Sequence, residues 1–134
     1  MFVGITNMRE IRFDVRLDPG AVKEYQDLDN SVVEIVNKSI DELQYRADEV
    51  GKLLGNKSSS KLAGCKEIKL SDAGIRIIFK ITAEKVDVFR IVYILAIEKR
   101  SEDLVFKVAD KRLRQFKKVT DKNKLLQGTK NWDE

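Results

Sequence analysis

Alternation of apolar and polar residues predicts four strands along the chain, at residues 11–17, 66–70, 75–81 and 86–97. Successive side chains of a strand point to opposite faces of a sheet, so a period of two places the apolar residues on one face. The last strand is apolar almost throughout and is expected at the centre of the sheet. Turns are expected at residues 71–74 and 82–85, which separate the last three strands.

Apolar residues spaced three and four apart predict three helices. A short helix is expected after Asp18, whose carboxylate is suited to capping its first turn. The sequence "SVVE" (residues 31–34) has the pattern of a capping box, and an apolar stripe continues from it to Leu54. Gly55 is expected to end this long helix. The third helix is expected at residues 101–116.

The predicted order is therefore strand, two helices, three strands and a final helix, which defines a small α+β domain. We expect a small antiparallel sheet with the helices packed on one face. A single domain is expected at residues 1–117, followed by a polar C-terminal tail at residues 118–134.

Composition narrows the possible chemistry. The 134 residues contain one cysteine, Cys65, and no histidine. Imidazole acid–base pairs and serine or cysteine triads are thereby excluded, and most zinc sites are as well. We expect no metal and no cofactor. The lone cysteine and the absence of a signal-like or membrane-spanning segment favour a cytoplasmic protein.

Charge is unevenly distributed, which is typical of proteins that bind polyanions. Residues 21–50 contain 3 basic and 8 acidic groups, whereas residues 51–100 contain 11 basic and 5 acidic groups. By alternation, Lys69, Arg76 and Lys80 share the open face of one hairpin, and Arg90 joins them if the register allows. Like charges crowded on a sheet are destabilising, which an anionic partner would explain. A solvated basic surface is the alternative interpretation.

The stretch "KLAGCKEIKLSDAGIRIIFKITAEKVDVFRIVYILAIEKRSEDLVFKVADKRL" (residues 61–113) resembles the RelE branch of the RelE/ParE toxin superfamily. The shared pattern is KL.G, a K.KL strand, a G.R strand, a long apolar strand ending in KR, and a final basic helix. With the preceding strand and helices, the resemblance covers roughly residues 11–115.

The resemblance implies a toxin of a type II toxin–antitoxin system that cuts mRNA in the ribosomal A site. Its partners would be a cognate antitoxin, the ribosome and mRNA. The oligomeric state of the free toxin stays open, and a monomer is one alternative. Lys69, Arg76 and Arg100 match catalytic positions of the family. Phe106 stands where active members have a tyrosine, and Glu67 stands where the first lysine of the K.K strand belongs. Additional RNA contacts are expected from Lys66, Lys80 and Arg90.

Two alternatives stay open at this point. A ParE-like protein would bind and inhibit DNA gyrase without catalysis, because one fold serves several functions. A toxin relic would bind only its antitoxin or RNA, and the departures at Glu67 and Phe106 favour it. The K.KL strand and Arg100 favour the ribonuclease.

Overall fold

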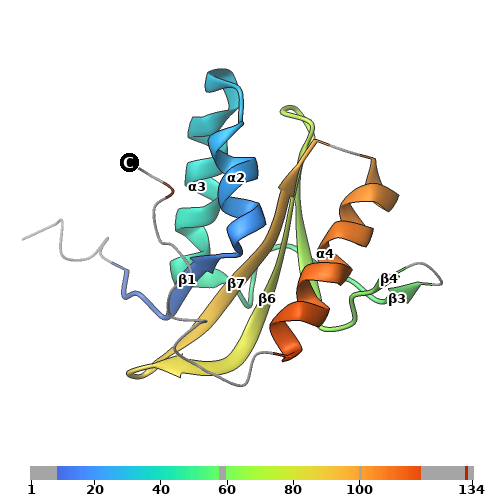
Figure 1. Ribbon diagram of the computed structural model, residues 1–134. Coiled ribbons are helices and arrows are strands. Elements are labelled where there is room, and N and C mark those ends of the chain that lie inside the picture. The colour runs from blue at the N-terminus through green and yellow to red at the C-terminus, as the bar shows by residue number, and fades with distance from the viewer. Residues whose placement is uncertain (1–8, 58–59, 100, 119–131, 133–134) are drawn as a thin grey trace, which may run out of the picture.

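A five-stranded sheet forms the centre of the protein in the computed structural model, which describes residues 9–57, 60–99, 101–118 and 132 (Figure 1). The spatial order of its strands is β1-β7-β6-β5-β2. The bounds are Phe13–Leu17 for β1, Lys52–Leu53 for β2, Cys65–Leu70 for β5, Ile75–Val86 for β6 and Phe89–Glu98 for β7. The first strand runs parallel to β7, and the other neighbours are antiparallel. A separate two-stranded ribbon joins β3 (Asn56–Lys57) to β4 (Ser60–Lys61).

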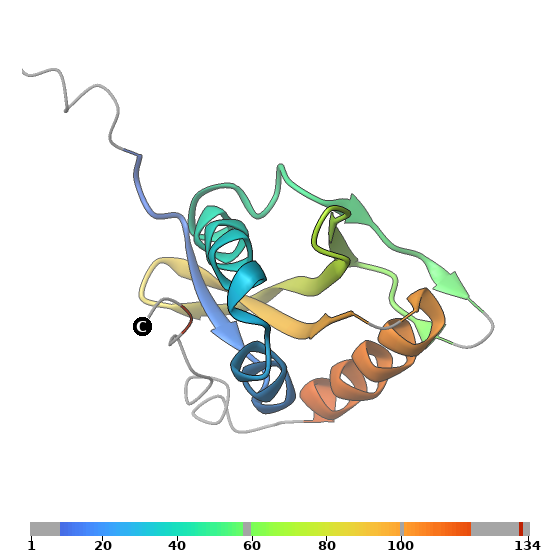
Figure 2. The ribbon, with the colours of Figure 1, turned by 90° about the horizontal axis from the view of Figure 1, so that it is seen from above.

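Helices cover both faces of this sheet. Figure 1 shows α2 (Pro19–Gln26) and α3 (Asn30–Arg46) on one side of the central strands and α4 (Glu102–Lys118) on the other, and Figure 2 shows the same helices from above. The α+β class and the order of the main elements are confirmed. The expectation of helices on one face was wrong, and so was that of a purely antiparallel sheet, because β1 is parallel to β7.

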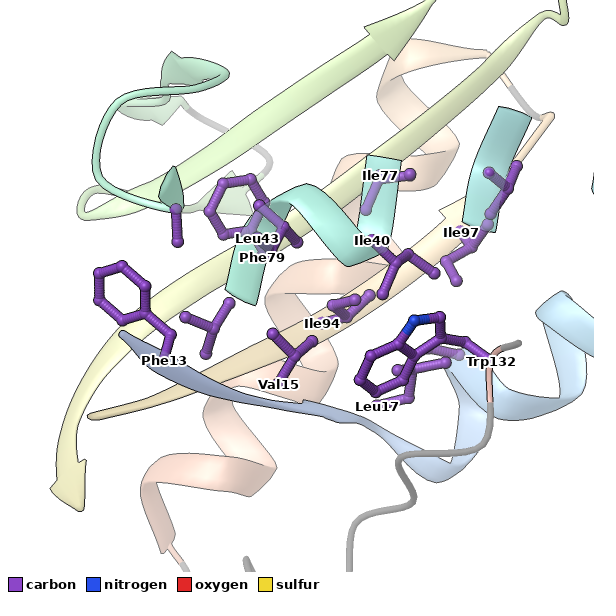
Figure 3. Packing of buried hydrophobic residues seen from close by; sticks show 14 of the residues in the cluster. Phe13, Val15, Leu17, Ile40, Leu43, Ile77, Phe79, Ile94, Ile97 and Trp132 are labelled. Atoms are coloured by element: carbon purple, nitrogen blue, oxygen red, sulfur yellow. The ribbon is translucent and has the colours of Figure 1, made fainter. Parts of the chain in front are cut away.

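The larger apolar core lies between the sheet and α3 (Figure 3). Alternation along β6 sends Ile75, Ile77 and Phe79 into it, as the sequence predicts. Trp132 also packs here, and its indole N–H donates a hydrogen bond to Asp41 Oδ1 at 2.7 Å. This contact ties one residue of the predicted tail to the domain.

A second core lies under α4 and explains why that helix packs on the opposite face of the sheet from α2 and α3. Ile78 on β6 and Leu95 on β7 are fully buried on this side. The apolar stripe of α4 covers them, through Val105, Phe106, Ala109 and Leu113. The central strands are therefore apolar on both faces and need a cover on each. Burial raises the pKa of Cys65 in this core to about 11, so the thiol packs as a neutral side chain.

The long helix is shorter than the sequence predicts. Asp29, not Ser31, is its N-cap, since the Asp29 carboxylate accepts a hydrogen bond from Ser31 N at 2.9 Å. The helix ends at Arg46, and the chain turns at Gly51, whose φ is +80°. Val50 and Leu54, expected on its last turns, instead lie in the loop before β2 and directly after β2. The expected turn at residues 82–85 is also wrong, because β6 continues to Val86.

One buried ion pair fixes α4 against α2. Arg112 donates hydrogen bonds of 2.8 Å to both carboxylate oxygens of Glu24 and one of 2.8 Å to Leu95 O. Gly20 leaves room for this guanidinium, because a Cβ there would lie 2.4 Å from it. The pair thus holds the helix that closes the second core.

We predict that Arg112→Met lowers the free energy of unfolding by about 2 to 4 kcal/mol, because it leaves the Glu24 carboxylate buried without a counterion. Urea unfolding monitored by circular dichroism measures the change. Arg114→Met is the matched control, since its side chain is 65% exposed and a surface pair is worth less than about 1 kcal/mol. Equal losses in the two variants would contradict this role for Arg112.

Candidate functional site

A cleft of about 680 Å³ opens where β2, β5 and the start of α4 meet. Its charged lining consists of Lys52, Lys57, Lys69, Glu67 and Glu102. Strand alternation explains part of this set, because Glu67 and Lys69 point to the α4 side of β5 while Ile68 packs toward the other core. The cleft is therefore polar, with more cations than carboxylates.

Three of these lining residues and the neighbouring Arg76 form a continuous chain of contacts, which we call the ion-pair chain: Lys57, Glu102, Arg76 and Glu67. Lys57 Nζ lies 2.9 Å from Glu102 Oε1, and Arg76 Nη1 lies 3.6 Å from Glu102 Oε2. Arg76 Nη1 also donates a hydrogen bond to Glu67 Oε2 at 2.8 Å. Charges alternate in sign along the chain, so each member is held by its neighbour.

The Glu67–Arg76 pair is the inner end of this chain. The side chain of Glu67 is 7% exposed and that of Arg76 is 20% exposed. A charge-assisted hydrogen bond at this depth fixes the direction of both groups. Lys69 lies beside them, because it is the cross-strand partner of Arg76 in the β5–β6 pairing. The structure thus brings together the predicted residues Lys69 and Arg76, and Arg76 also contacts Glu67 on β5.

Phe106 lies at the wall of the cleft but is mostly part of the core. Its residue is 3% exposed, and the Lys57 ammonium lies 4.9 Å from the centre of its ring. A cation over an aromatic face is favourable. In this arrangement the lysine covers the ring, so a base would stack there only after Lys57 moves.

The other predicted RNA contacts do not gather at the cleft. Lys66 lies on the opposite face of β5, and its ammonium donates to Ala47 O at 3.2 Å. Lys80 shares the face of Arg76 but lies farther along β6, opposite Cys65. Arg90 lies near the far end of the β6–β7 hairpin, roughly 25 Å from the cleft at the usual rise per residue. Arg100 lies outside the described residues.

No sequence pattern marked Lys52 or Lys57 as site residues. Lys52 falls in the last turn of the predicted long helix, and Lys57 falls in the polar loop expected after it. The short strands β2 and β3 carry these lysines to the cleft. Glu102 was also missed, because it reads as an ordinary acidic residue in the first turn of a helix, where the dipole favours it.

Neighbouring cations in the cleft keep the carboxylate of Glu102 ionised. The hydrogen bond from Lys57 holds the pKa of Glu102 below its usual value, and the nearby Arg76 and Lys69 act in the same direction. Among the described residues, no group of three His, Cys, Asp or Glu is placed to hold a metal ion. The residues that the structure describes contain no helix long and apolar enough to cross a membrane.

Comparison with known proteins identifies the fold. No family model matches the sequence, and neither does any curated protein. The solved structure of the isolated Escherichia coli RelE toxin is 26% identical with a TM-score of 0.51, and the match covers 78% of this chain and 98% of that one. An E. coli RelE mutant in complex with an antitoxin RelBc peptide is 27% identical with a TM-score of 0.51, over 74% of this chain and 95% of that one.

A more distant structure agrees on the fold. The toxin–antitoxin complex RelBE2 from Mycobacterium tuberculosis is 21% identical with a TM-score of 0.52, and the match covers 70% of this chain and 98% of that one. The sheet with helices on both faces is thus the α+β fold of small bacterial toxins. This chain belongs to the RelE-like toxin superfamily.

We predict that Lys57→Met raises the pKa of Glu102 toward its usual value, because the hydrogen bond from Lys57 is the largest cause of its depression. Methionine keeps the length of the side chain but removes the charge. Side-chain carboxyl NMR titration measures the shift. Lys61→Met, in the paired strand β4, is the control and leaves the pKa unchanged. An unshifted pKa in Lys57→Met would contradict the ion-pair chain.

Proposed function

We propose that this protein is the toxin of a toxin–antitoxin pair and that it cuts mRNA on the ribosome. The observation that carries the proposal is the Glu67–Arg76–Lys69 group in a cleft of a RelE-like fold. The related E. coli and M. tuberculosis proteins occur in complexes with an antitoxin, which supports a cognate antitoxin for this chain as well.

The groups of the cleft suit cleavage by an internal hydroxyl. In this step the RNA 2′-oxygen attacks the adjacent phosphorus and loses its proton, and the bond to the 5′-oxygen breaks. Glu67 is the carboxylate placed to take that proton, in the position where the family pattern has a lysine. Arg76 and Lys69 place positive charge where the phosphorane develops negative charge, which is usually the largest catalytic contribution.

The leaving 5′-oxygen needs a proton in the same reaction. The cleft offers ammonium groups for this role, and Lys57 is the one held over Phe106. Phenylalanine has no hydroxyl to donate. In this proposal Lys57 on β3 takes over the proton donation that the family pattern assigns to a tyrosine at position 106. The balance of protons is then complete: Glu67 gains one and Lys57 loses one.

A non-catalytic relic is the second candidate, and the Glu67–Arg76 contact is the observation that favours it. The carboxylate neutralises part of the charge that Arg76 would offer to phosphate, and Phe106 is buried. Such a protein would keep antitoxin or ribosome binding without cleavage. A ParE-like inhibitor of DNA gyrase has no observation of its own here.

We predict that the wild-type protein cuts mRNA on programmed ribosomes and that Arg76→Ala, Lys69→Ala and Glu67→Gln lower the rate by about a hundredfold or more. Glutamine keeps the shape of Glu67 and its contact with Arg76 but accepts no proton at neutral pH. Primer extension on purified ribosomes measures the rate. Lys85→Ala is the control, because this exposed residue lies toward the far end of the same strand as Arg76.

Three results separate the candidates. If Glu67→Gln cut mRNA at the full rate and Arg76→Ala did not, Glu67 would not be the proton acceptor, but the protein would still be a ribonuclease. Cleavage by Phe106→Tyr alone would identify a binding-competent site that lacks one proton donor. No cleavage by either protein, together with co-sedimentation with ribosomes, would establish the relic.

A further inference from the structure

A second hollow of about 300 Å³ lies next to the cleft, at the turn between β5 and β6. Lys69 lines both hollows. Arg76 lines the second one and donates its hydrogen bond to Glu67 in the first. The Lys69–Arg76 cross-strand pair is therefore a wall that the two hollows share.

The charges of the two hollows differ. The cleft contains the carboxylates of Glu67 and Glu102, whereas the charged residues described in the second hollow are Lys69, Arg76 and Lys99, all cations. In the described part of the chain, neither Lys69 nor Lys99 has a carboxylate within ion-pairing distance. Three cations around one hollow repel one another, and an anion between them relieves this cost.

The second hollow is also open to a ligand. It lies beside the turn closed by a hydrogen bond from Gly74 N to Ser71 O at 3.2 Å. Gly74 has a φ of +68°, and a Cβ built there would meet no atom within 4 Å. An RNA strand that leaves the cleft across the Lys69–Arg76 pair therefore meets open space at the second hollow.

We propose that this hollow binds a second backbone phosphate of the RNA, one nucleotide from the phosphate that is cut, and that Lys99 is a binding residue. The inference rests on the proposed RNA substrate and specifies its length. Lys69 and Arg76 lie between two successive phosphates, and Lys99 contacts only the second. The smallest RNA that uses the whole site then has two phosphates.

Lys99 has one competing role that the test must separate. It also lines an acidic hollow with Glu24, Asp27, Asp29 and Glu98, and its charge contributes to the lowered pKa of Asp29, whose largest cause is the hydrogen bond from Ser31 N. If this were its whole role, removing the charge would affect Asp29 and leave RNA binding unchanged.

The experiment compares two short uridine RNAs whose 2′-oxygens are methylated so that they are not cut. The dinucleotide has one phosphate and the trinucleotide has two. NMR titration of the labelled protein gives each Kd for the wild type, Lys99→Ala, Arg76→Ala and the control Lys85→Ala. We expect the wild type and the control to bind the trinucleotide about two- to fivefold more tightly than the dinucleotide, as for an exposed charge contact.

Lys99→Ala is expected to lose this gain and to bind the dinucleotide normally. Its salt dependence for the trinucleotide should also be weaker, by about 0.7 in the slope of log K against log salt, because one phosphate contact is lost. An undiminished gain in Lys99→Ala, or no gain in the wild type, would overturn the second site. The proposed function would survive the loss of the second site if Arg76→Ala abolished dinucleotide binding, because the first phosphate site would then be intact in the wild type. No binding of either RNA would overturn the second site on the isolated protein, whereas the proposed cleavage on ribosomes is decided by primer extension.

Discussion

The pairing of β6 with β7 is the constraint on which the rest of the protein depends. These strands are apolar on both faces, so the sheet is stable only when a layer of side chains covers each side. The first helices supply one layer and α4 supplies the other. The candidate cleft lies where this second layer begins, because the first turn of α4 brings Glu102 to the polar ends of β5 and β6.

The ion-pair chain joins this architecture to chemistry. It begins on the short ribbon at Lys57, passes through the start of α4, and ends at Glu67 on β5. The same contacts that orient Arg76 also cancel part of its charge, so the proposed phosphate would have to compete with Glu67 and Glu102 for the guanidinium. Charged groups inside a cleft stabilise a transition state most when their geometry is fixed before the reaction.

The sequence was sufficient for the local structure of the central strands but not for the layers. The period of two along β6 places Arg76 and Ile78 on one face, as the structure has them. No local pattern says which face α4 covers, because its stripe fits either side. The site was predictable at Lys69 and Arg76, which are strand partners, but not at Lys57, whose position depends on where α3 ends. Lys66, predicted as an RNA contact, alternates to the face opposite the cleft and donates to Ala47 O.

The chemistry of the cut ends tests the central claim most directly. An internal attack by the 2′-oxygen, assisted by Glu67 and Arg76, leaves a 2′,3′-cyclic phosphate on the upstream fragment. Mass spectrometry of mRNA fragments from programmed ribosomes identifies that end. The account predicts cyclic phosphate ends in wild-type reactions and their loss in Glu67→Gln. Fragments that end in a 3′-hydroxyl would contradict it, because they require a different attacking group.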